Sequence, residues 1–482
     1  MRFDLKSFQF ADEGRAPDAL AVAAGDRSLT WAQLRTEAHA WADAARKHGV
    51  APDVPVAIYG HKEAAFFVAM VGALLIGAPF VPVDTIYPPE RLRRIVEIVQ
   101  AAAVFDAAAG SFTAGEGAML EERGLAYVMF TSGSTGDPKG VQIGRESVGL
   151  LGDWMLGSFG LGEAPVFMNQ APFSFDLSMY EVFATLASGG SCVLNAREQI
   201  AAPGPWMARL AAHGITVWVS TPSFAHQQLA NRDFSPSSLP TLRTFLFCGE
   251  PLPAALAKKL RQRFPDASIL NTYGPTEATV ATTWIEVTDA VLAAHDPLPV
   301  GHAKPDSVLL VDEGEICIVG DHVMRGYLNR ADLNAAKLYT YDDGRRAFRT
   351  GDLGLMEEGG LLFCRGRMDD QIKLNGYRIE LAEIDEALHG LPGVEASACA
   401  VLRRPDGTAV RLIGFVTGAE AAGEQAALLG PQALSGWKER LAERLPPYMV
   451  PSELVACPAL PMSNNHKIDR KKLIDIYSAI PV

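Results

Sequence analysis

Length, charge and cysteine content already exclude several classes of protein. The chain has 482 residues, 48% of them apolar, which predicts a sizeable core divided over two or more structural units. The net charge of −13 argues against nonspecific binding of nucleic acid, so a bound phosphate has to meet positive charge that is held locally. The six cysteines lie far apart and none belongs to a Cys-x-x-Cys pair, which argues against zinc and favours a reduced, cytoplasmic setting. No apolar signal-peptide segment follows Met1.

Residues 64–83 form a stretch of twenty residues without a charge. This length nominally spans a bilayer, but Gly72, Gly77, Pro79 and Pro82 interrupt the stretch. We therefore predict a buried helix that stops at Gly77, then a short buried strand, and no membrane span.

The next apolar run ends in a loop of glycine and hydroxyl residues, at positions 127–141 (YVMFTSGSTGDPKGV). Small residues let backbone N–H groups approach a ligand, hydroxyls add donors, and Lys139 adds positive charge, which together suit a polyphosphate. No Gly-Lys-Ser/Thr follows at P-loop spacing, so the pattern does not indicate a P-loop kinase or GTPase. The alternative is a flexible Gly/Ser loop that binds nothing.

Strand and helix patterns alternate further along the chain. We predict a strand at 242–248, a helix at 254–264, and a strand at 267–270 that ends in a loop at Asn271. This alternation is typical of an α/β fold with mainly parallel sheets, in which ligands bind at the carboxyl ends of the strands. The loops at Thr131, Gly249 and Asn271 can therefore converge on one site. Charge density rises at 366–370, where we place a boundary between a core of residues 1–368 and a small α+β domain of residues 369–482.

The loop at 127–141 resembles the phosphate loop of the adenylate-forming superfamily. This superfamily includes acyl-CoA synthetases, luciferases and the adenylation domains of nonribosomal peptide synthetases. Further strings resemble its motifs in the same order, at 29–34 (LTWAQL), 75–84 (LIGAPFVPVD), 271–277 (NTYGPTE), 349–352 (RTGD), 366–373 (GRMDDQIK) and 465–470 (NHKIDR). One such string is weak support for the resemblance. Seven strings in the same order, spread over nearly the whole chain, are strong support. The resemblance implies a core with the ATP and amino-acid sites and a mobile lid that carries a catalytic lysine.

The resemblance also implies ATP and Mg²⁺, with one role for each matching residue. A substrate carboxylate attacks the α-phosphorus of ATP, and donors and cations stabilise the charge that develops on the phosphoryl oxygens. Lys467, Thr131 and Glu277 are expected to act in catalysis, and Glu277 is expected to hold Mg²⁺. The residues expected to bind ATP are Thr131, Ser132, Gly133, Ser134, Thr135, Gly136, Lys139, Gly249, Glu250, Asn271, Thr272, Tyr273, Gly274, Pro275, Thr276, Asp352, Arg367 and Lys467.

Within this set, Tyr273 is expected to stack on adenine and Asp352 to accept the ribose hydroxyls, with Arg367 close by. Outside its motif Glu277 could be a capping acid, Asp352 could close a turn, and Lys467 could be a solvated lysine of a basic tail. Superfamily members usually carry glycine before this lysine, whereas this chain has His466.

Asp176 indicates the class of substrate. It is an acid inside the apolar string at 169–178 (NQAPFSFDLS). A lone acid in such a string is costly unless a cation satisfies it. In amino-acid-activating members an aspartate here pairs with the substrate α-ammonium, which selects amino acids over plain carboxylic acids. The alternative is an internal Arg or Lys partner.

Among amino-acid activators, the chain is most similar to the D-alanyl carrier protein ligases, in strings at 170–178, 217–224, 247–250, 271–281 and 371–380. Residues 179–183 (MYEVF) instead look like peptide-synthetase adenylation domains, and the segment at 305–315 is shorter than usual. Tyr180 and Cys248 favour a small side chain, with D- or L-alanine as first candidates and chirality left open; a lone cysteine can also be a core residue. The expected substrate-binding residues are Asp176, Leu177, Tyr180, Cys248, Gly249, Thr272, Val280 and Lys467.

A second half-reaction is implied, in which the amino acid passes to the phosphopantetheine thiol of a carrier protein. The chain has no carrier-like Gly-Gly-x-Ser segment, so we expect a separate carrier. The C-terminal domain is expected to rotate about Asp369, which withdraws Lys467 and brings in the face with Lys373 and Gly376. Two other functions stay open: an acyl- or aryl-CoA ligase, in which Asp176 has no purpose, and a non-catalytic nucleotide-binding scaffold.

Overall fold

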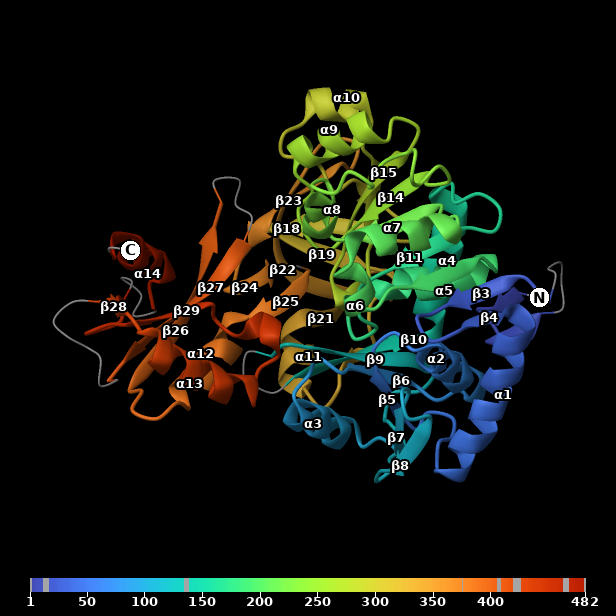
Figure 1. Cartoon of the computed structure of the whole chain (residues 1–482), viewed down its shortest axis with the longest axis horizontal. Coiled ribbons are helices and arrows are strands. Elements are labelled where there is room, and N and C mark those ends of the chain that lie inside the picture. Colours follow the sequence, from blue (N-terminus) through green and yellow to red (C-terminus); the bar gives the residue numbers. More distant parts are fainter. Residues whose placement is uncertain are drawn as a thin grey trace. The chain divides into compact units, whose positions relative to one another are not determined.

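The structure is a computed structural model that describes residues 2–11, 17–133, 138–374, 376–404, 409–418, 426–462 and 468–480. The chain divides into two compact units, which are described separately. Unit 1 comprises residues 1–84, 96–130 and 140–368, and unit 2 comprises residues 85–95, 131–139 and 369–482. Unit 2 thus takes in two short stretches that precede the predicted domain boundary; the division into a core and a mobile lid stays a prediction. Figure 1 labels the elements of both units.

Two large sheets of mainly parallel strands dominate unit 1, as the alternating pattern predicted. The described strands of the first sheet follow the order β20 (Gly326–Tyr327), β10 (Lys139–Gly144), β9 (Leu125–Thr131), β6 (Phe80–Asp84), β5 (Val56–Gly60), β7 (Ala103–Asp106) and β8 (Ser111–Ala114). Those of the second follow the order β17 (His302–Ala303), β16 (Thr283–Glu286), β15 (Ser268–Tyr273), β14 (Thr244–Phe247), β13 (Val217–Ser220), β11 (Val166–Asn169), β12 (Ser191–Leu194), β3 (Leu20–Ala23) and β4 (Ser28–Thr30). Antiparallel strands lie only at the edges of the second sheet, within the described pairing.

The predicted strand at 267–270 was too short at its C-terminal end. Strand β15 continues through Tyr273, because Asn271–Tyr273 also pair with β16 on their other side. Pairing with a neighbouring strand that lies later in the chain is a tertiary effect, and the local sequence pattern does not contain it.

A third sheet is antiparallel and was not predicted. It contains β18 (Val308–Asp312), β19 (Glu315–Val319), β22 (Arg346–Met356) and β21 (Leu338–Thr340), with β23 (Leu362–Arg367) paired to β22. A small antiparallel pair, β1 (Arg2–Asp4) and β2 (Gln9–Ala11), lies at the N-terminus.

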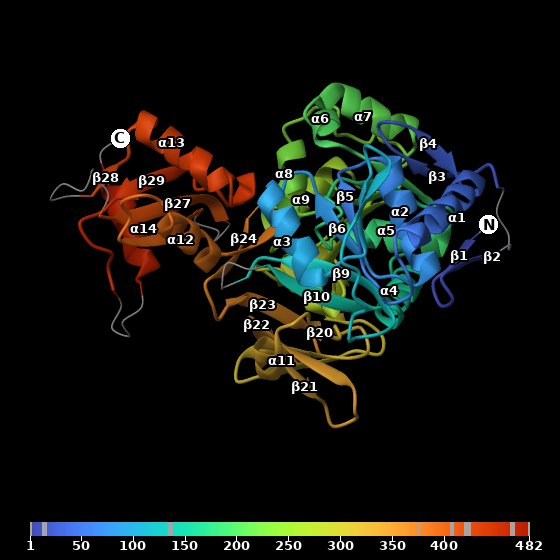
Figure 2. The same ribbon diagram turned by 90° about the horizontal axis from the view of Figure 1, so that it is seen from below.

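Helix α2 (Ala64–Ile76) confirms the prediction of a buried helix that stops at Gly77. It contacts β5 and β6 of the first sheet and β3 of the second, so it is apolar all round and has no solvent face. Gly77 ends the helix with φ of 88°, a left-handed conformation that favours glycine. Figure 2 shows α1 (Trp31–Lys47), α2 and β5 in succession. Across the described residues, no helix has both the length and the apolar character that crossing a membrane requires.

The string at 29–34 has a local structural role at the start of α1. The Gln33 N–H donates to Thr30 Oγ1 at 3.2 Å, and the Thr30 N–H donates to Gln33 Oε1 at 2.8 Å. This capping box satisfies donors that would otherwise have no partner at the helix N-terminus.

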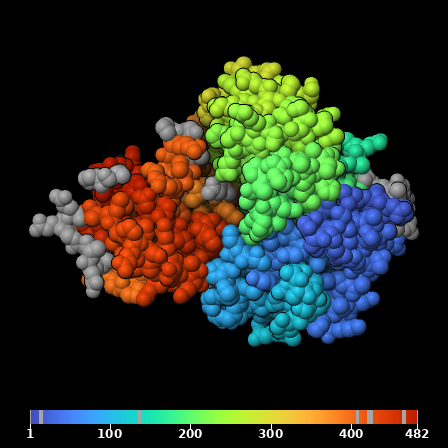
Figure 3. Space-filling model, in the orientation of Figure 1, coloured from blue at the N-terminus to red at the C-terminus, as the bar shows by residue number. Residues whose placement is uncertain are grey.

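The remaining helices of unit 1 cover the sheets. Helices α7, α8 and α9 pack on the second sheet through an aromatic core that includes Trp206, Trp218 and Phe245. Their bounds and those of the other helices are α4 (Arg145–Ser158), α5 (Ser178–Ser188), α6 (Arg197–Ile200), α7 (Pro203–Ala212), α8 (Pro222–Gln228), α9 (Ala254–Arg263), α10 (Asp289–Ala294) and α11 (Ala331–Lys337). Figure 3 shows one face of unit 1, where the first part of the chain (blue) and its middle part (green) adjoin.

Unit 2 has its own core around Ile384, Leu412 and Leu454. A hairpin of β24 (Gln371–Leu374) and β25 (Tyr377–Glu380) precedes a mixed sheet in the order β26 (Ala396–Arg403), β27 (Ala409–Thr417), β29 (Glu453–Ala456) and β28 (Ala427–Leu428). Its helices are α12 (Leu381–His389), α13 (Pro431–Ala442) and α14 (Arg470–Ala479), together with the first part of α3 (Pro89–Val99).

Candidate active site

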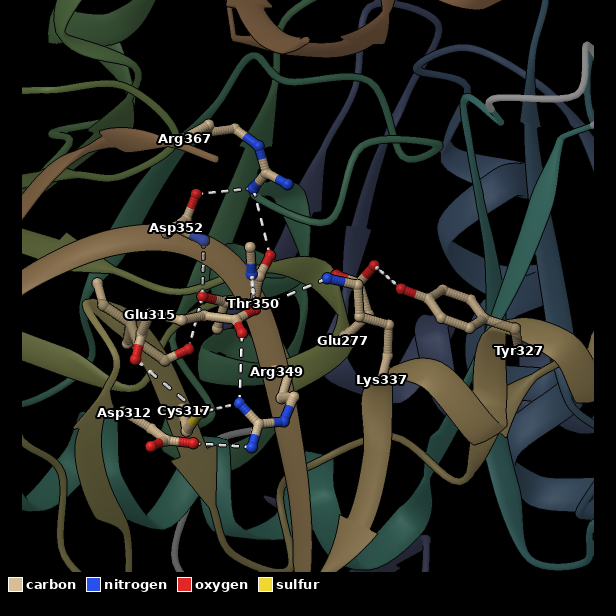
Figure 4. Close-up of polar contacts among 12 residues, drawn as sticks. Glu277, Asp312, Glu315, Cys317, Tyr327, Lys337, Arg349, Thr350, Asp352 and Arg367 are labelled. Atoms are coloured by element: carbon tan, nitrogen blue, oxygen red, sulfur yellow. Dashed lines mark hydrogen bonds and ion pairs between the residues drawn. The ribbon is translucent and has the colours of Figure 1, made fainter. Parts of the chain in front are cut away.

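Tyr273, Asp352 and Arg367 form a polar group in unit 1 that we call the nucleoside cluster. Arg367 Nη1 donates to Asp352 Oδ1 at 2.7 Å (Figure 4). The Tyr273 hydroxyl donates to Asp352 Oδ2 at 2.6 Å. Asp352 and Arg367 face each other because they are paired residues of β22 and β23. Burial, and then the Asp352 charge, raise the pKa of Tyr273 well above its ordinary value, so its hydroxyl stays a donor. The cluster is a fixed carboxylate with lone pairs left for further hydroxyl donors.

Glu277, the predicted Mg²⁺ ligand, lies on a short 3-10 helix, Thr276–Ala278, and its side chain is fully buried. The Tyr327 hydroxyl donates to Glu277 Oε1 at 2.6 Å (Figure 4). The Met324 N–H donates to the Glu277 carbonyl oxygen at 2.7 Å. A buried carboxylate fixed in this way supplies the hard oxygen that Mg²⁺ prefers, so the residue fits the ion. Sequence analysis missed Tyr327, because only the fold brings it to a residue fifty positions away.

The chain after Glu277 is held in an unusual conformation. Thr279 and Val280 have φ of 55° and 69°, in the left-handed region that a β-branched residue rarely adopts. The Thr279 hydroxyl donates to the His322 carbonyl oxygen at 2.7 Å, which helps to hold the turn. Just before it, a Cβ on Gly274 would lie 2.4 Å from Ala281 Cα, so only glycine allows this approach. Such strain persists where the surroundings enforce it, and it is common at functional sites.

Four predicted substrate-binding residues of unit 1 come together in what we call the side-chain cluster: Tyr180, Cys248, Thr272 and Val280. The Tyr180 hydroxyl donates to Thr272 Oγ1 at 3.1 Å, and that hydroxyl donates to the Phe247 carbonyl oxygen at 2.8 Å. The Cys248 thiol lies 3.8 Å from the Val280 carbonyl oxygen, and all four side chains are buried. The large Tyr180 ring therefore lies near Cys248, and the prediction that the two residues favour a small substrate side chain stays a prediction.

Asp176 belongs to the segment between β11 and α5, and Leu177 precedes the first residue of α5. The Asp176 side chain is 8% exposed, and its charge contributes to the raised pKa of both Tyr127 and Tyr180, after the larger effect of burial. Asp176 therefore lies near the side-chain cluster.

The predicted strand ends carry Asn271, Gly249 and Glu250. The contacts described for Asn271 and Glu250 are hydrogen bonds to other parts of the protein backbone. The Asn271 side-chain amide donates to the Pro299 carbonyl oxygen at 2.8 Å, and the Ser223 N–H donates to Glu250 Oε2 at 3.0 Å. Gly249 has φ of 91°, which favours glycine at the end of β14. Of the other predicted ATP-binding positions, Pro275 and Thr276 begin the 3-10 helix of Glu277.

Residues 131–133 and 138–139 of the predicted phosphate loop lie in unit 2, and Ser132 and Lys139 bind residues of the same unit. Lys139 Nζ lies 2.8 Å from Glu380 Oε1, with both side chains largely buried. The Ser132 hydroxyl donates to the Arg378 carbonyl oxygen at 2.8 Å and accepts from the Glu380 N–H at 3.1 Å. Thr131 Oγ1 is buried and has no partner among the described residues. Gly133 is the last described residue before the gap at 134–137.

The hinge and thioester residues also lie in unit 2. Asp369 Oδ1 accepts from the Gln371 N–H at 3.2 Å. Lys373 pairs with Arg378 across the β24–β25 hairpin, and Gly376 has φ of 85° in its turn. The predicted positions Ser134, Thr135, Gly136, His466 and Lys467 lie outside the described residues. Their roles, like those of the whole predicted site, stay predictions.

Comparison with known proteins agrees with the resemblance found in the sequence. The family model described as "AMP-binding enzyme" matches residues 10–116 and 106–328. A protein of Bacillus cytotoxicus named D-alanine–D-alanyl carrier protein ligase is 38% identical over 96% of this chain and 97% of its own length.

Solved structures share the fold. The Vibrio cholerae adenylation domain AlmE, in complex with glycyl-adenosine-5'-phosphate, matches with a TM-score of 0.82 and 21% identity over 98% of this chain and 97% of its own. The o-succinylbenzoate CoA synthetase of Bacillus subtilis matches with a TM-score of 0.79 and 20% identity, over 95% of this chain and 96% of its own. Because an adenylation domain and a CoA synthetase match almost equally well, these two likenesses establish the adenylate-forming fold alone. The family match and the 38% identical relative go further: the chain belongs to the AMP-binding enzyme family.

Proposed function

We propose that this protein activates a small amino acid with ATP and transfers it to the phosphopantetheine thiol of a separate carrier protein. D- or L-alanine is the first candidate. The observation that carries the proposal is the buried Asp176 carboxylate near the side-chain cluster, in a chain 38% identical to a relative named for D-alanine and a D-alanyl carrier protein. A carboxylate there offers a partner for an α-ammonium, which a plain carboxylic acid lacks.

The first half-reaction makes an aminoacyl-adenylate. The substrate carboxylate attacks the α-phosphorus of ATP, the bond to the bridging oxygen breaks, and pyrophosphate leaves. The nucleoside cluster is proposed to hold the ribose, with Asp352 as acceptor of its hydroxyls. Glu277 is proposed to hold Mg²⁺, whose charge offsets that of the phosphates. Lys467 is proposed to neutralise the reacting carboxylate and α-phosphate.

The second half-reaction makes a thioester. The carrier thiol loses its proton and attacks the acyl carbon, and AMP leaves. We propose that residues 369–482 rotate about Asp369 between the two steps, so that Lys467 gives way to the face with Lys373 and Gly376. The proposed compartment is the cytoplasm, where ATP and reduced thiols are both present.

Pyrophosphate release, screened with both alanine enantiomers, glycine, serine, propionate and acetate, tests the proposal. Release that needs ATP, Mg²⁺ and a small amino acid supports it. A strong response to propionate or acetate with none to the amino acids would instead identify an acyl-CoA ligase, which a second assay with coenzyme A would register as acyl-CoA. No release with any carboxylate would favour a nucleotide-binding scaffold.

A further inference from the structure

A buried lysine, Lys62, lies at the carboxyl ends of parallel strands from both large sheets. It is the second residue after β5, and β11 of the other sheet ends at Asn169. A second polar contact links the same sheets nearby, where Asp84 at the end of β6 bonds His61 and Arg197, one turn beyond the end of β12. The carboxyl ends of parallel strands are where α/β folds place their functional groups, so this position calls for an explanation beyond packing.

All described partners of the Lys62 ammonium belong to the segment at 169–176, which ends at Asp176. Lys62 Nζ donates to Asn169 Oδ1 and to the Ala171 carbonyl oxygen, and it lies 4.1 Å from the centre of the Phe173 ring. Lys62 as a whole is only 3% exposed to solvent. One cation therefore holds the last residue of β11 and two points of the stretch at 170–176, which has no regular secondary structure.

Glu181, on α5, holds the same segment from its other end. The Asn169 amide donates to Glu181 Oε1 at 3.0 Å, so Asn169 bridges Lys62 and Glu181. The Asn169 carbonyl oxygen accepts two further bonds at 3.0 Å, from the backbone and the side chain of Asn195. Glu181 is fully buried, and its Oε2 has no partner among the described residues.

Both charges are costly in this position. Burial lowers the pKa of Lys62 to about 8 and raises the pKa of Glu181 to about 8, and each charge partly offsets that effect on the other. Apolar residues of similar volume often stabilise a core as well as such a pair or better, so stability alone does not account for it. A buried polar network also fixes the geometry of the groups that it joins.

We infer that Lys62, Asn169 and Glu181 are positioning residues, which hold the segment at 169–176 so that the Asp176 carboxylate meets the substrate ammonium. The inference rests on the proposed amino-acid activation and adds a cause for its selectivity. Asp176 lies between the points fixed by Lys62 and the helix that carries Glu181. When either anchor is lost, the carboxylate shifts while the residues of the nucleoside cluster, on other strands, keep their contacts.

The test measures a selectivity ratio, which is kcat/KM for the best amino acid divided by kcat/KM for the same acid without its amino group, such as alanine and propionate. We expect Lys62→Met to lower this ratio roughly 10- to 100-fold, as a displacement of about 1 Å does at a reacting centre, with the KM for ATP unchanged. Glu181→Gln should lower it less, because the amide oxygen can still accept from Asn169. Arg209→Met is the matched control: Arg209 is a partly buried cation that also bonds backbone carbonyls, but those of Ala23, Ala24 and Leu194. Its ratio should equal that of the wild type.

The double variant Lys62→Met with Glu181→Gln separates positioning from stability. In Lys62→Met the buried Glu181 carboxyl takes up a proton, because its pKa, already about 8, loses the lowering effect of Lys62. Replacing this carboxyl by an amide removes the ionisable group, so the melting temperature of the double variant should be at or above that of Lys62→Met. The selectivity ratio should stay low in the double variant. A ratio that recovers together with the melting temperature would overturn the inference, and so would a wild-type ratio in folded Lys62→Met. If Lys62→Met does not fold, Glu181→Gln and the double variant carry the test by the same ratio. A wild-type enzyme that does not prefer the amino acid would sink the proposed function instead.

Discussion

In unit 1, the two oxygens of Asp352 accept bonds from Arg367 and Tyr273, and the three residues need no ligand to hold their geometry. In unit 2, by contrast, Lys139 and Ser132 of the phosphate loop bond the Glu380 carboxylate, the Glu380 N–H and a backbone carbonyl. Carboxylate and carbonyl oxygens are the same kind of acceptor as a phosphate oxygen. The nucleoside cluster is thus preorganised, whereas under the proposed function the ATP phosphates at Lys139 would have to replace acceptors that are already in place.

This comparison extends to the amino-acid end of the site. The side-chain cluster is fixed by bonds within unit 1, from Tyr180 to Thr272 and from Cys248 to the Val280 carbonyl. Mutation of a preorganised group should cause a large loss of affinity for one substrate only, because the neighbouring groups do not rearrange. The phosphate loop should show small effects, of either sign.

The largest loss is expected for Asp176→Ala. Removal of one partner of a buried ion pair costs about 3–5 kcal/mol, which is roughly 10²–10⁴ in affinity. Amino-acid-dependent pyrophosphate exchange should nearly disappear, while ATP binding measured by calorimetry stays. An unchanged apparent affinity for the amino acid would show that Asp176 has another role.

A loss confined to ATP is expected for Asp352→Ala. Hydrogen bonds to a charged group contribute about 1.5–3 kcal/mol, so the KM for ATP should rise roughly 10- to 100-fold with the KM for the amino acid unchanged. The matched control is Asp312→Ala, which removes another carboxylate of the same sheet, paired with Arg349 at 2.8 Å but exposed to solvent (Figure 4). Exposed ion pairs contribute little, so its kinetics should match the wild type. Equal effects of the two variants would mean that the nucleoside cluster does not bind ATP.

Burial of Lys304 beside the side-chain cluster should make the free energy of unfolding depend on pH. Its ammonium donates to the Ala281 carbonyl oxygen at 2.9 Å, next to Val280, and burial lowers its pKa from 10.5 to about 7. Between these values the unfolded chain binds more protons than the folded chain, so this contribution to the free energy of unfolding rises with pH. Below pH 7 both states are protonated and the cost of the buried charge is constant.

The measurement is urea unfolding of wild type and Lys304→Met between pH 7 and 9.5. The stability of the variant relative to wild type should fall by about 3 kcal/mol over this range. Arg209→Met is the control, since arginine stays protonated throughout and its difference from wild type should be flat. A flat difference for Lys304→Met would mean that Lys304 does not titrate in this window.

The smallest effect, and one of opposite sign, is expected for Glu380→Gln. The neutral amide holds Lys139 less strongly, and a change of about 0.5–1.5 kcal/mol lowers the KM for ATP roughly two- to ten-fold. Glu453→Gln, which alters the more exposed Arg411–Glu453 pair in unit 2, should leave this KM unchanged. A higher KM for ATP in Glu380→Gln would break the comparison, because Glu380 would then assist rather than compete.

Local patterns predicted much of the fold. The uncharged helix with its Gly77 stop, and the helix at 254–264 seen as α9, are set by composition and by short-range turn chemistry. The end of β15 and the antiparallel third sheet were not predicted, since they depend on pairing between strands far apart in the chain.

The candidate site divides in the same way. The motifs gave Asp352, Tyr273 and Glu277, and the structure adds the contacts between them and their neighbours. Tyr327 and Lys62 belong to none of the motifs, and each acquires its contact only when separate strands are assembled. Residues that position others are therefore the part of a site that is hardest to find in one sequence.

The pairing of Asp352 with Arg367 depends on a turn that touches neither residue. Strands β22 and β23 are joined at residues 357–361, where Gly359 and Gly360 have φ of 88° and 81°. An exposed turn usually tolerates an added residue, but in a hairpin the length of the turn sets which side chains face each other. A β-bulge between Asp352 and Gly354 already offsets the register, and a further shift of β23 by one residue against β22 would move Arg367 to the opposite face of the sheet from Asp352. Under the proposed function, the geometry that would receive the ribose hydroxyls thus depends partly on the register of this hairpin, which a comparison of residue types alone would not reveal.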